Sequence, residues 1–259
     1  MNAIKPLNLN YSKEFERLVA IVSRLRKDCP WDREQTHASI APHLIEEAYE
    51  VVETIDKADM SELGKELGDI LLHVVFHANL AEESQSFSLA EVIWQENEKL
   101  IYRHPHVFGE AEAATAGEVK QNWEQLKRKE TGRTSIIDGV PKALPALQRA
   151  ARVQDKAAKV GFDWHDPKDV IDKIAEEAGE FLAETDHDRR TDEFGDLLFA
   201  LVNYSRHIGI DAETALRKAT DKFDYRFRKL EKEVESQSKP WKEYSLEELE
   251  EFWRKAKML

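Results

Sequence analysis

Two stretches of the chain share one pattern of acidic and apolar residues, and this pattern decides the fold. Residues 44–77 read LIEEAYEVVETIDKADMSELGKELGDILLHVVFH, and residues 174–204 read IAEEAGEFLAETDHDRRTDEFGDLLFALVNY. Each stretch begins with Glu-Glu-x-x-Glu and continues to Glu-x-Gly-Asp. Apolar residues recur at intervals of three and four in both, which indicates amphipathic helices rather than strands. An internal repeat of this kind predicts two copies of one helical unit.

The sequence around the repeat predicts an all-α fold. Proline is absent from residues 43–104, 106–140 and 168–239, so long helices can run through these segments. Helix-start signals precede several apolar runs, as a Ser, Thr or Asp with Glu three residues later at 59, 88, 115 and 245. Asp166 stands before Pro167 as a further start, and Gly161 and Gly209 mark helix ends. We expect about ten helices and little or no sheet.

The domain boundary is predicted from a change in composition between the two copies. Glycine, serine, threonine and proline interrupt the helical periodicity between residues 131 and 141. Each copy also starts with a short Trp/Asp turn, at residues 29–32 and 161–164. We therefore predict an N-terminal unit at 1–132, a linker at 133–141 and a C-terminal unit at 142–259.

The composition excludes several classes of protein. Of the 259 residues, 51 are acidic and 38 basic, giving a formal net charge of −13 that repels phosphate backbones and argues against stable nucleic-acid binding. No apolar run approaches the ~20 residues that a membrane span requires, and the first eleven residues lack the apolar stretch of a signal peptide. Cys29 is the single cysteine, which excludes an internal disulfide and a cysteine metal cage. We expect a cytoplasmic protein.

The repeated carboxylates predict a metal site. Residues three apart on a helix share a face, so Glu177 projects with Glu180, and Glu193 projects with Asp196. If the two helices pair antiparallel, four carboxylates meet, and they require a cation to stay ionised. Oxygen-only ligands favour Mg²⁺, with Mn²⁺ as a substitute. The same geometry is available in the first copy to four residues: Glu47, Glu50, Glu66 and Asp69.

Basic residues downstream of each copy indicate that the metal shares its ligands with phosphates. Lys99 and Arg103 match Lys222 and Arg226, and Trp123 matches Trp253. A carboxylate-bound Mg²⁺ beside a pair of cations is typical of a polyphosphate site. One Glu-Glu-x-x-Glu alone is usually a solvated helix face, and it is the repetition of the whole arrangement that argues for function.

At these residues the chain resembles the MazG family of nucleoside triphosphate pyrophosphohydrolases, within the all-α NTP pyrophosphatase group. The most specific matches besides the carboxylate pairs are at residues 29–36, 103–108 and 160–164. The resemblance implies two tandem helical-bundle units of four or five helices, in a homodimer whose sites form at helix interfaces. It also implies Mg²⁺-dependent hydrolysis of nucleoside triphosphates between the α and β phosphates, which releases a nucleoside monophosphate and pyrophosphate.

The resemblance assigns roles to residues of the C-terminal unit. The metal ligands would be Glu177, Glu180, Glu193 and Asp196. Lys222, Arg226 and Lys173 would hold the phosphates, Trp253 would lie against the base or ribose, and Glu176 is either a solvated neighbour or orients the attacking water. The predicted catalytic set is therefore Glu176, Glu177, Lys222 and Arg226. Hydrolysis is associated with the C-terminal unit, yet the N-terminal unit keeps a full second set: Glu47, Glu50, Glu66, Asp69, Lys99, Arg103 and Trp123.

Other interpretations stay open at the level of the sequence. A non-catalytic, nucleotide-binding regulatory scaffold would use the same ligands without turnover. A di-iron carboxylate oxidoreductase is disfavoured because the Glu-x-x-His motif of such bundles is missing. His73 and His77 follow Asp69 where the second copy has Ala200 and Tyr204, and packing or hydrogen bonding is favoured over a zinc pair. The base preference is not predicted.

Overall fold

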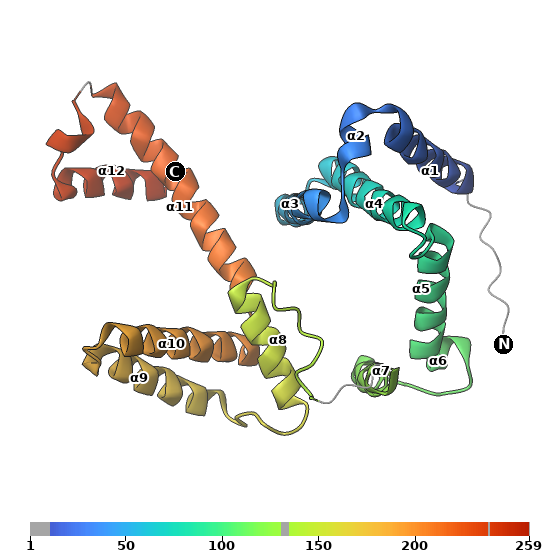
Figure 1. The fold of residues 1–259 in the computed structure, drawn as a ribbon. Helices are drawn as coiled ribbons and strands as arrows, with labels where there is room; N and C mark the ends of the chain where they lie inside the picture. The colour runs from blue at the N-terminus through green and yellow to red at the C-terminus, as the bar shows by residue number, and fades with distance from the viewer. Residues whose placement is uncertain (1–10, 131–134, 238, 259) are drawn as a thin grey trace. The chain divides into compact units, whose positions relative to one another are not determined.

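The computed structural model describes residues 11–130, 135–237 and 239–258, and this part of the chain contains helices and no strand (Figure 1). The prediction of an all-α fold is confirmed. Contacts divide the chain into one unit at Met1–Gly132 and another at Arg133–Leu259. The predicted linker at 133–141 begins with residues that lie outside the described ranges. Its remainder packs on the C-terminal unit, where the buried Lys156 donates hydrogen bonds to the carbonyls of Ile136 (3.3 Å) and Asp138 (2.9 Å).

The N-terminal unit places its longest helices next to one another. In chain order its helices are α1 (Tyr11–Asp28), α2 (Pro30–Glu34), α3 (His37–Lys57), α4 (Met60–Glu83), α5 (Leu89–Arg103), α6 (Pro105–Phe108) and α7 (Ala116–Glu130). Helices α3 and α4 form a hairpin, and α1 packs on α4. Val22, Ile40, Val75 and Phe76 belong to the buried apolar cluster that joins these three helices. Each such side chain stabilises the unit by about 1.5–3 kcal/mol through burial.

The C-terminal unit repeats the hairpin. Its helices are α8 (Ala146–Ala158), α9 (Pro167–Ala183), α10 (His187–His207), α11 (Ala212–Ser236), the 3₁₀ turn η1 (Trp241–Glu243) and α12 (Leu246–Met258). Helices α9 and α10 lie side by side in Figure 1 and make the most extensive helix pair of the chain. Helix α10 packs on α8, and α11 packs on α12 and α8.

The predicted helix boundaries follow local chemistry. The Asp59 carboxylate accepts hydrogen bonds from the backbone N–H groups of Ser61 and Glu62 (both 3.1 Å) at the start of α4. Ser88 caps α5 in a reciprocal capping box, and Asp166 caps α9 before Pro167. Gly161 and Gly209 take φ values of +86° and +71° just after α8 and α10, in the left-handed region that glycine adopts without strain. These starts and ends are confirmed.

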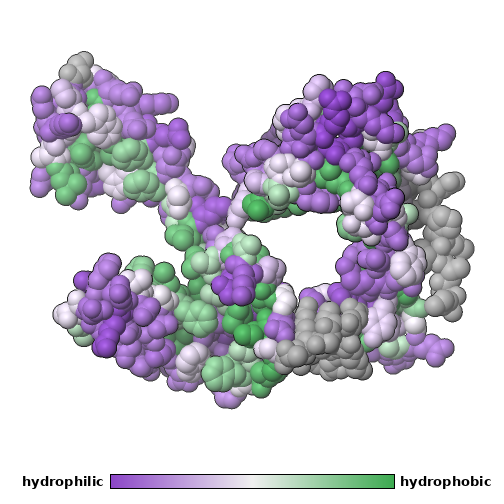
Figure 2. All heavy atoms as spheres, in the orientation of Figure 1, coloured by the Kyte–Doolittle hydropathy of each residue, from purple (hydrophilic) through white to green (hydrophobic). Residues whose placement is uncertain are grey.

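Matching positions of the two hairpins expose apolar side chains. Three residues on α4 (Leu67, Leu71, Val74) and their equivalents on α10 (Phe194, Leu198, Leu201) are each between 39% and 51% exposed. The spacing of four and three residues puts each trio on one helix face. Figure 2 shows further apolar surface over α8 and over the α11–α12 pair.

Within the described residues, every helix is too short or too polar to cross a bilayer.

Candidate active site

Three carboxylates meet between the two helices of the C-terminal hairpin. Glu177 and Glu180 lie on α9 and Glu193 lies on α10, and each offers an oxygen within 4.8 Å of the others. A short loop joins the two helices, and Asp186 at its end caps α10 through the N–H groups of Asp188 and Arg189. The predicted meeting of the two helices therefore occurs, with three of the four carboxylates in the cluster.

Burial and the repulsion between the carboxylates of the cluster together raise the pKa of one of them. Burial raises the pKa of Glu193, and the charges of Glu180, Glu177 and Asp196 raise it further. A raised carboxyl pKa means that the ionised form is disfavoured at this position. A cation bound among these oxygens would reverse that effect, so the donor set fits a hard divalent metal.

Lys173 partly compensates the buried member of the cluster. Glu177 is only 6% exposed, and its carboxylate lies 2.7 Å from the Lys173 ammonium. The same ammonium donates to Glu176 at 2.8 Å. These two hydrogen bonds, Glu176 first, raise the pKa of Lys173 above its ordinary value. The chain thus holds Lys173 and Glu176 directly beside the carboxylate cluster, one helical turn apart.

The remaining predicted residues lie apart from this cluster. Asp196 is exposed and stands outside the three-carboxylate group, acting on Glu193 through its charge. Lys222 and Arg226 lie on α11, and within the described residues neither forms a hydrogen bond or ion pair with the three carboxylates. Trp253 on α12 packs against Phe223 of α11, with ring centroids 5.1 Å apart. The predicted site is therefore divided into an acidic part on α9 and α10 and a basic, aromatic part on α11 and α12.

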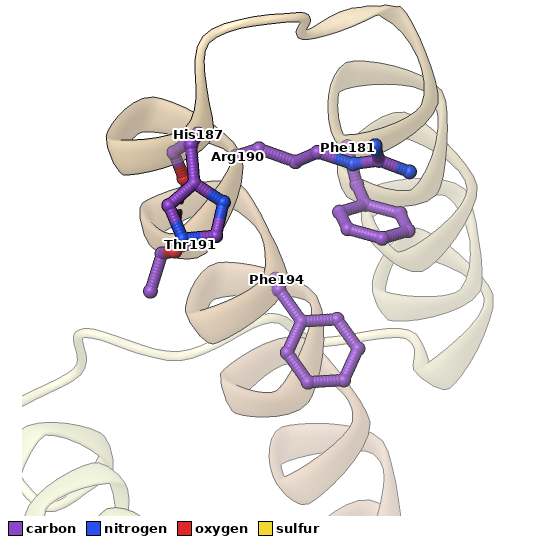
Figure 3. A pocket seen from close by; sticks show the side chains of 5 residues that line it. All are labelled: Phe181, His187, Arg190, Thr191 and Phe194. Carbon is purple, nitrogen blue, oxygen red and sulfur yellow. Dashed lines mark hydrogen bonds between the residues drawn. The ribbon is translucent and has the colours of Figure 1, made fainter.

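A cavity on the same pair of helices is lined by residues that the sequence did not single out. It has a volume of about 410 Å³ and is lined by Phe181, His187, Arg190, Thr191 and Phe194 (Figure 3). Arg190 reaches from α10 across to α9, where its guanidinium carbon lies 4.9 Å from the centre of the Phe181 ring. The Phe181 and Phe194 rings are 5.4 Å apart.

One signal in the sequence points to this cavity. Phe181 follows Glu180 directly and Phe194 follows Glu193 directly, so the two phenylalanines are the sequence neighbours of two carboxylates of the cluster. Arginine and phenylalanine at such positions are common on ordinary helices, and only the pairing of α9 with α10 joins them. The cavity supplies a cation and two aromatic faces on the same two helices that carry the acidic cluster.

The N-terminal hairpin holds the equivalent cluster with a different third member. Glu47 on α3 meets Glu66 and Asp69 on α4, each again with an oxygen within 4.8 Å of the others. Burial is the main cause that raises the pKa of Glu47, followed by the charges of Asp69 and Glu50. For Glu66 burial is followed by a hydrogen bond to Glu50, and its pKa is also raised. The place of Lys173 is taken by His43, whose Nδ1 lies 3.5 Å from Glu46.

The downstream residues of this first copy again lie on separate helices. Lys99 on α5 pairs with Glu96 of its own helix. The Arg103 guanidinium stacks 5.3 Å from the Trp123 ring of α7. The predicted second set of residues is therefore divided in the same way as the first.

The Trp/Asp turn of the C-terminal unit is fastened to the end of α10. Asp163 accepts a hydrogen bond from Arg206 and lies 3.1 Å from His207 Nε2. Burial opposes ionisation of Asp163, but Arg206 and His207 outweigh it, so the pKa of the carboxyl lies below its ordinary value. This network orients the turn that leads into α9.

Comparisons with known proteins cover nearly the whole chain. The MazG nucleotide pyrophosphohydrolase domain matches residues 35–108 and 165–230, which contain both carboxylate hairpins. The chain is 47% identical over 247 residues to the nucleoside triphosphate pyrophosphohydrolase/pyrophosphatase MazG of Thermotoga maritima, covering 94% of this chain and 95% of that protein. It is 42% identical over 255 residues to the nucleoside triphosphate pyrophosphohydrolase of Escherichia coli K12, covering 94% and 97%. A crystal structure of a mazG-related protein from Thermotoga maritima aligns with 44% of this chain and 98% of its own, at 29% identity and a TM-score of 0.40.

Proposed function

Because the chain belongs to the MazG nucleotide pyrophosphohydrolase family, we propose that it hydrolyses nucleoside triphosphates between the α and β phosphates. The products are a nucleoside monophosphate and pyrophosphate. The chain is an enzyme of the nucleoside triphosphate pyrophosphohydrolase type. The observation that carries the proposal is the group formed by Glu177, Glu180 and Glu193, whose clustered oxygens would hold a cation that in turn binds phosphate.

The cofactor that we propose is Mg²⁺, with Mn²⁺ as a substitute. The cluster consists of carboxylate oxygens alone, which are the ligands of hard divalent cations, and the raised pKa of Glu193 indicates that positive charge is lacking there. Glu177, Glu180 and Glu193 would hold the ion, with Asp196 at the edge of the cluster. When bound, it would polarise the phosphate oxygens and lower the pKa of a bound water.

The other side chains of the C-terminal site have separate roles in binding and catalysis. Lys173 balances Glu177 before substrate arrives and is placed to turn toward a phosphate oxygen. Glu176, which shares the Lys173 ammonium, accepts a hydrogen bond from the attacking water and orients it. Lys222 and Arg226 offset the charge that develops on the departing pyrophosphate, and Trp253 lies against the base or ribose.

The division of the site between hairpin and α11 supports a homodimer. We propose that the exposed apolar trios on α4 (Leu67, Leu71, Val74) and α10 (Phe194, Leu198, Leu201) pack against a second copy. These matched apolar faces are otherwise left in water. In that arrangement Lys222 and Arg226 of one copy complete the carboxylate cluster of the other. The lone Cys29, which is free, agrees with a reducing compartment, and we propose the cytoplasm.

One assay tests the function directly. The purified protein is incubated with each nucleoside triphosphate and Mg²⁺, and both products are quantified. We expect equal amounts of pyrophosphate and monophosphate, and Glu177→Gln should abolish them while helical circular dichroism is retained. Orthophosphate with a diphosphate would contradict the assigned bond. Triphosphate binding without any product would contradict the proposed activity and support the interpretation as a regulatory scaffold.

A further inference from the structure

Four of the nine histidines of the chain lie on the hairpin of the N-terminal unit, His37 and His43 on α3 and His73 and His77 on α4. The Nδ1 atoms of His37 and His77 are 2.8 Å apart, and their rings are stacked with centroids 5.1 Å apart. The ring centroids of His73 and His77 are 6.4 Å apart. The hairpin therefore gathers imidazoles from both of its helices.

The imidazole pair of α4, His73 and His77, contains two nitrogens that the fold leaves unsatisfied. His73 Nδ1 and His77 Nε2 are buried, and neither has a hydrogen-bond partner among the described residues. The sequence favours packing or hydrogen bonding for this pair, and a hydrogen bond does account for His77 Nδ1. It leaves the other two nitrogens unexplained. Buried polar atoms are nearly always satisfied, so these nitrogens indicate a missing ligand.

One metal ion between the two imidazoles would satisfy both nitrogens. Residues four apart on a helix lie on the same face, so His73 and His77 can bind a single ion. Tetrahedral zinc with bonds of about 2.0–2.1 Å places the centroids of two imidazoles about 5 Å apart, so the rings need to approach by about 1 Å. Burial is the main cause that lowers the pKa of both imidazoles, which favours the neutral form that binds metals.

The two histidines of α3 complete the arrangement. When His77 Nε2 binds an ion, its Nδ1 carries the proton and donates to His37 Nδ1, as a metal-bound imidazole usually does to a neighbouring acceptor. His43 is exposed and lines the same cavity of about 250 Å³ as His73. Its ring can turn toward the pair as a third nitrogen ligand, and water in the cavity would fill the remaining position.

The carboxylate repeat does not require these imidazoles. The second copy keeps its carboxylate cluster, but Ala200 and Tyr204 stand where the first copy has the imidazole pair. Imidazole nitrogen suits zinc, copper and nickel, whereas carboxylate oxygen suits magnesium and manganese. The histidines of the first copy are therefore a donor set of a different chemical class.

We propose that the N-terminal unit binds a transition-metal ion of the zinc class through His43, His73 Nδ1 and His77 Nε2. His37 is a positioning residue that holds the His77 imidazole in the tautomer with its proton on Nδ1. The site is distinct in its donor atoms from the carboxylate cluster of the same unit. The inference does not depend on the proposed hydrolysis, because metal binding alone tests it.

The experiment uses the full-length protein, stripped of metal and labelled with ¹⁵N-histidine. Zn²⁺ is titrated with Mg²⁺ in excess, and long-range ¹H–¹⁵N spectra follow each imidazole nitrogen. The resonances of the pair are assigned by their loss in His73→Ala and His77→Gln. We expect the signals of His73 Nδ1 and His77 Nε2 to shift together and to saturate with a single dissociation constant.

Variants make the assignment to the imidazoles specific. His73→Ala introduces the residue that the second copy carries, and it and His77→Gln should each weaken zinc binding at least a hundredfold, as the response of the remaining imidazole reports. His43→Ala should weaken it at least tenfold. Two matched controls should leave the response within twofold: Glu66→Gln removes a neighbouring carboxylate, and His165→Ala removes an exposed histidine of the other unit.

The role of His37 has its own readout. His37→Ala should weaken zinc binding about tenfold and release the fixed tautomer of His77, which the ¹⁵N shifts of that ring report. His37→Gln should restore both, because its amide oxygen can accept the same hydrogen bond.

Three results would overturn the inference. The first is that no signal of the pair moves with Zn²⁺ in the wild-type protein, a measurement that does not depend on the folding of any variant. The second is a response of either imidazole that survives loss of the other, because the two would then not share an ion. The third is a response that Glu66→Gln abolishes, which would place the zinc on the carboxylates.

Discussion

Binding of Mg²⁺ is expected to stabilise the two units separately, because each hairpin brings together three carboxylates whose mutual repulsion a cation would relieve. One ion per cluster at 100 times its dissociation constant contributes about 2.7 kcal/mol to the free energy of unfolding. A unit of about 130 residues unfolds with an entropy of about 2.1 cal/mol/K per residue, so this corresponds to a rise of about 10 °C in its melting temperature.

Matched substitutions assign the stabilisation to a cluster. Glu177→Gln keeps the shape of the buried side chain and removes one ligand charge, and Glu47→Gln is the equivalent change in the first copy. We expect the first to abolish the Mg²⁺-dependent rise of the C-terminal unit alone, and the second to abolish that of the N-terminal unit alone. Without metal, Glu177→Gln should alter stability by less than about 1 kcal/mol, because loss of the partly exposed Lys173 pair is offset by relief of repulsion on Glu193.

Differential scanning calorimetry at fixed protein concentration measures both transitions as Mg²⁺ is added. The rise should also shrink as the pH is lowered, since a carboxyl with a raised pKa, such as Glu193, takes up a proton that competes with the metal. The reasoning is refuted if Glu177→Gln retains the full rise of its unit. It is equally refuted if neither transition responds to Mg²⁺ or Mn²⁺.

Three further predictions concern the C-terminal unit. Because the pKa of Asp163 is lowered, its contribution to stability is present above the ordinary value of 3.8 and is lost as the pH falls through the lowered value. Asp163→Asn should therefore reduce the free energy of unfolding by about 1–3 kcal/mol at pH 7 and leave it unchanged in strong acid. Thermal melts across this pH range measure the difference. If sites are shared between copies, mixing the inactive Glu177→Gln and Arg226→Ala proteins should restore about a quarter of wild-type pyrophosphate release, whereas no recovery would place both groups in one chain. Sedimentation should give twice the chain mass of 29.9 kDa for the wild type and a lower mass for Leu198→Glu, and a wild-type mass of one chain would exclude the dimer.

The parts of the structure that sequence predicts best depend on near neighbours. The start of α4 at Asp59 and the ends of α8 and α10 at glycines follow from side-chain caps and from backbone freedom, which act over three or four residues. The meeting of Glu177, Glu180 and Glu193 is predictable for a similar reason: the helices are consecutive and joined by a short loop, so an antiparallel hairpin is the natural arrangement.

The parts that sequence does not predict depend on contacts between distant elements. The repeat indicates that Lys222 and Arg226 belong to a site, but helical periodicity does not say which helix lies opposite α11. The cavity lined by Phe181 and Arg190 depends on the register between α9 and α10, and in the sequence only the positions of the two phenylalanines beside the carboxylates point to it. Which carboxylate is third in each cluster, Glu180 in one and Asp69 in the other, also depends on details of helix packing.

The ion pair between Lys173 and Glu177 has a consequence for the order in which ligands arrive. An ammonium already sits on the buried carboxylate, so a bare metal ion must displace it before it gains that ligand. A metal ion that entered already attached to a triphosphate would offer Lys173 a new anionic partner in the same step. We therefore expect the metal–nucleotide complex to be the true substrate and metal-free triphosphate to act as a competitor. In the first copy His43 stands at this position in place of a lysine, so we expect free metal to bind there before the nucleotide.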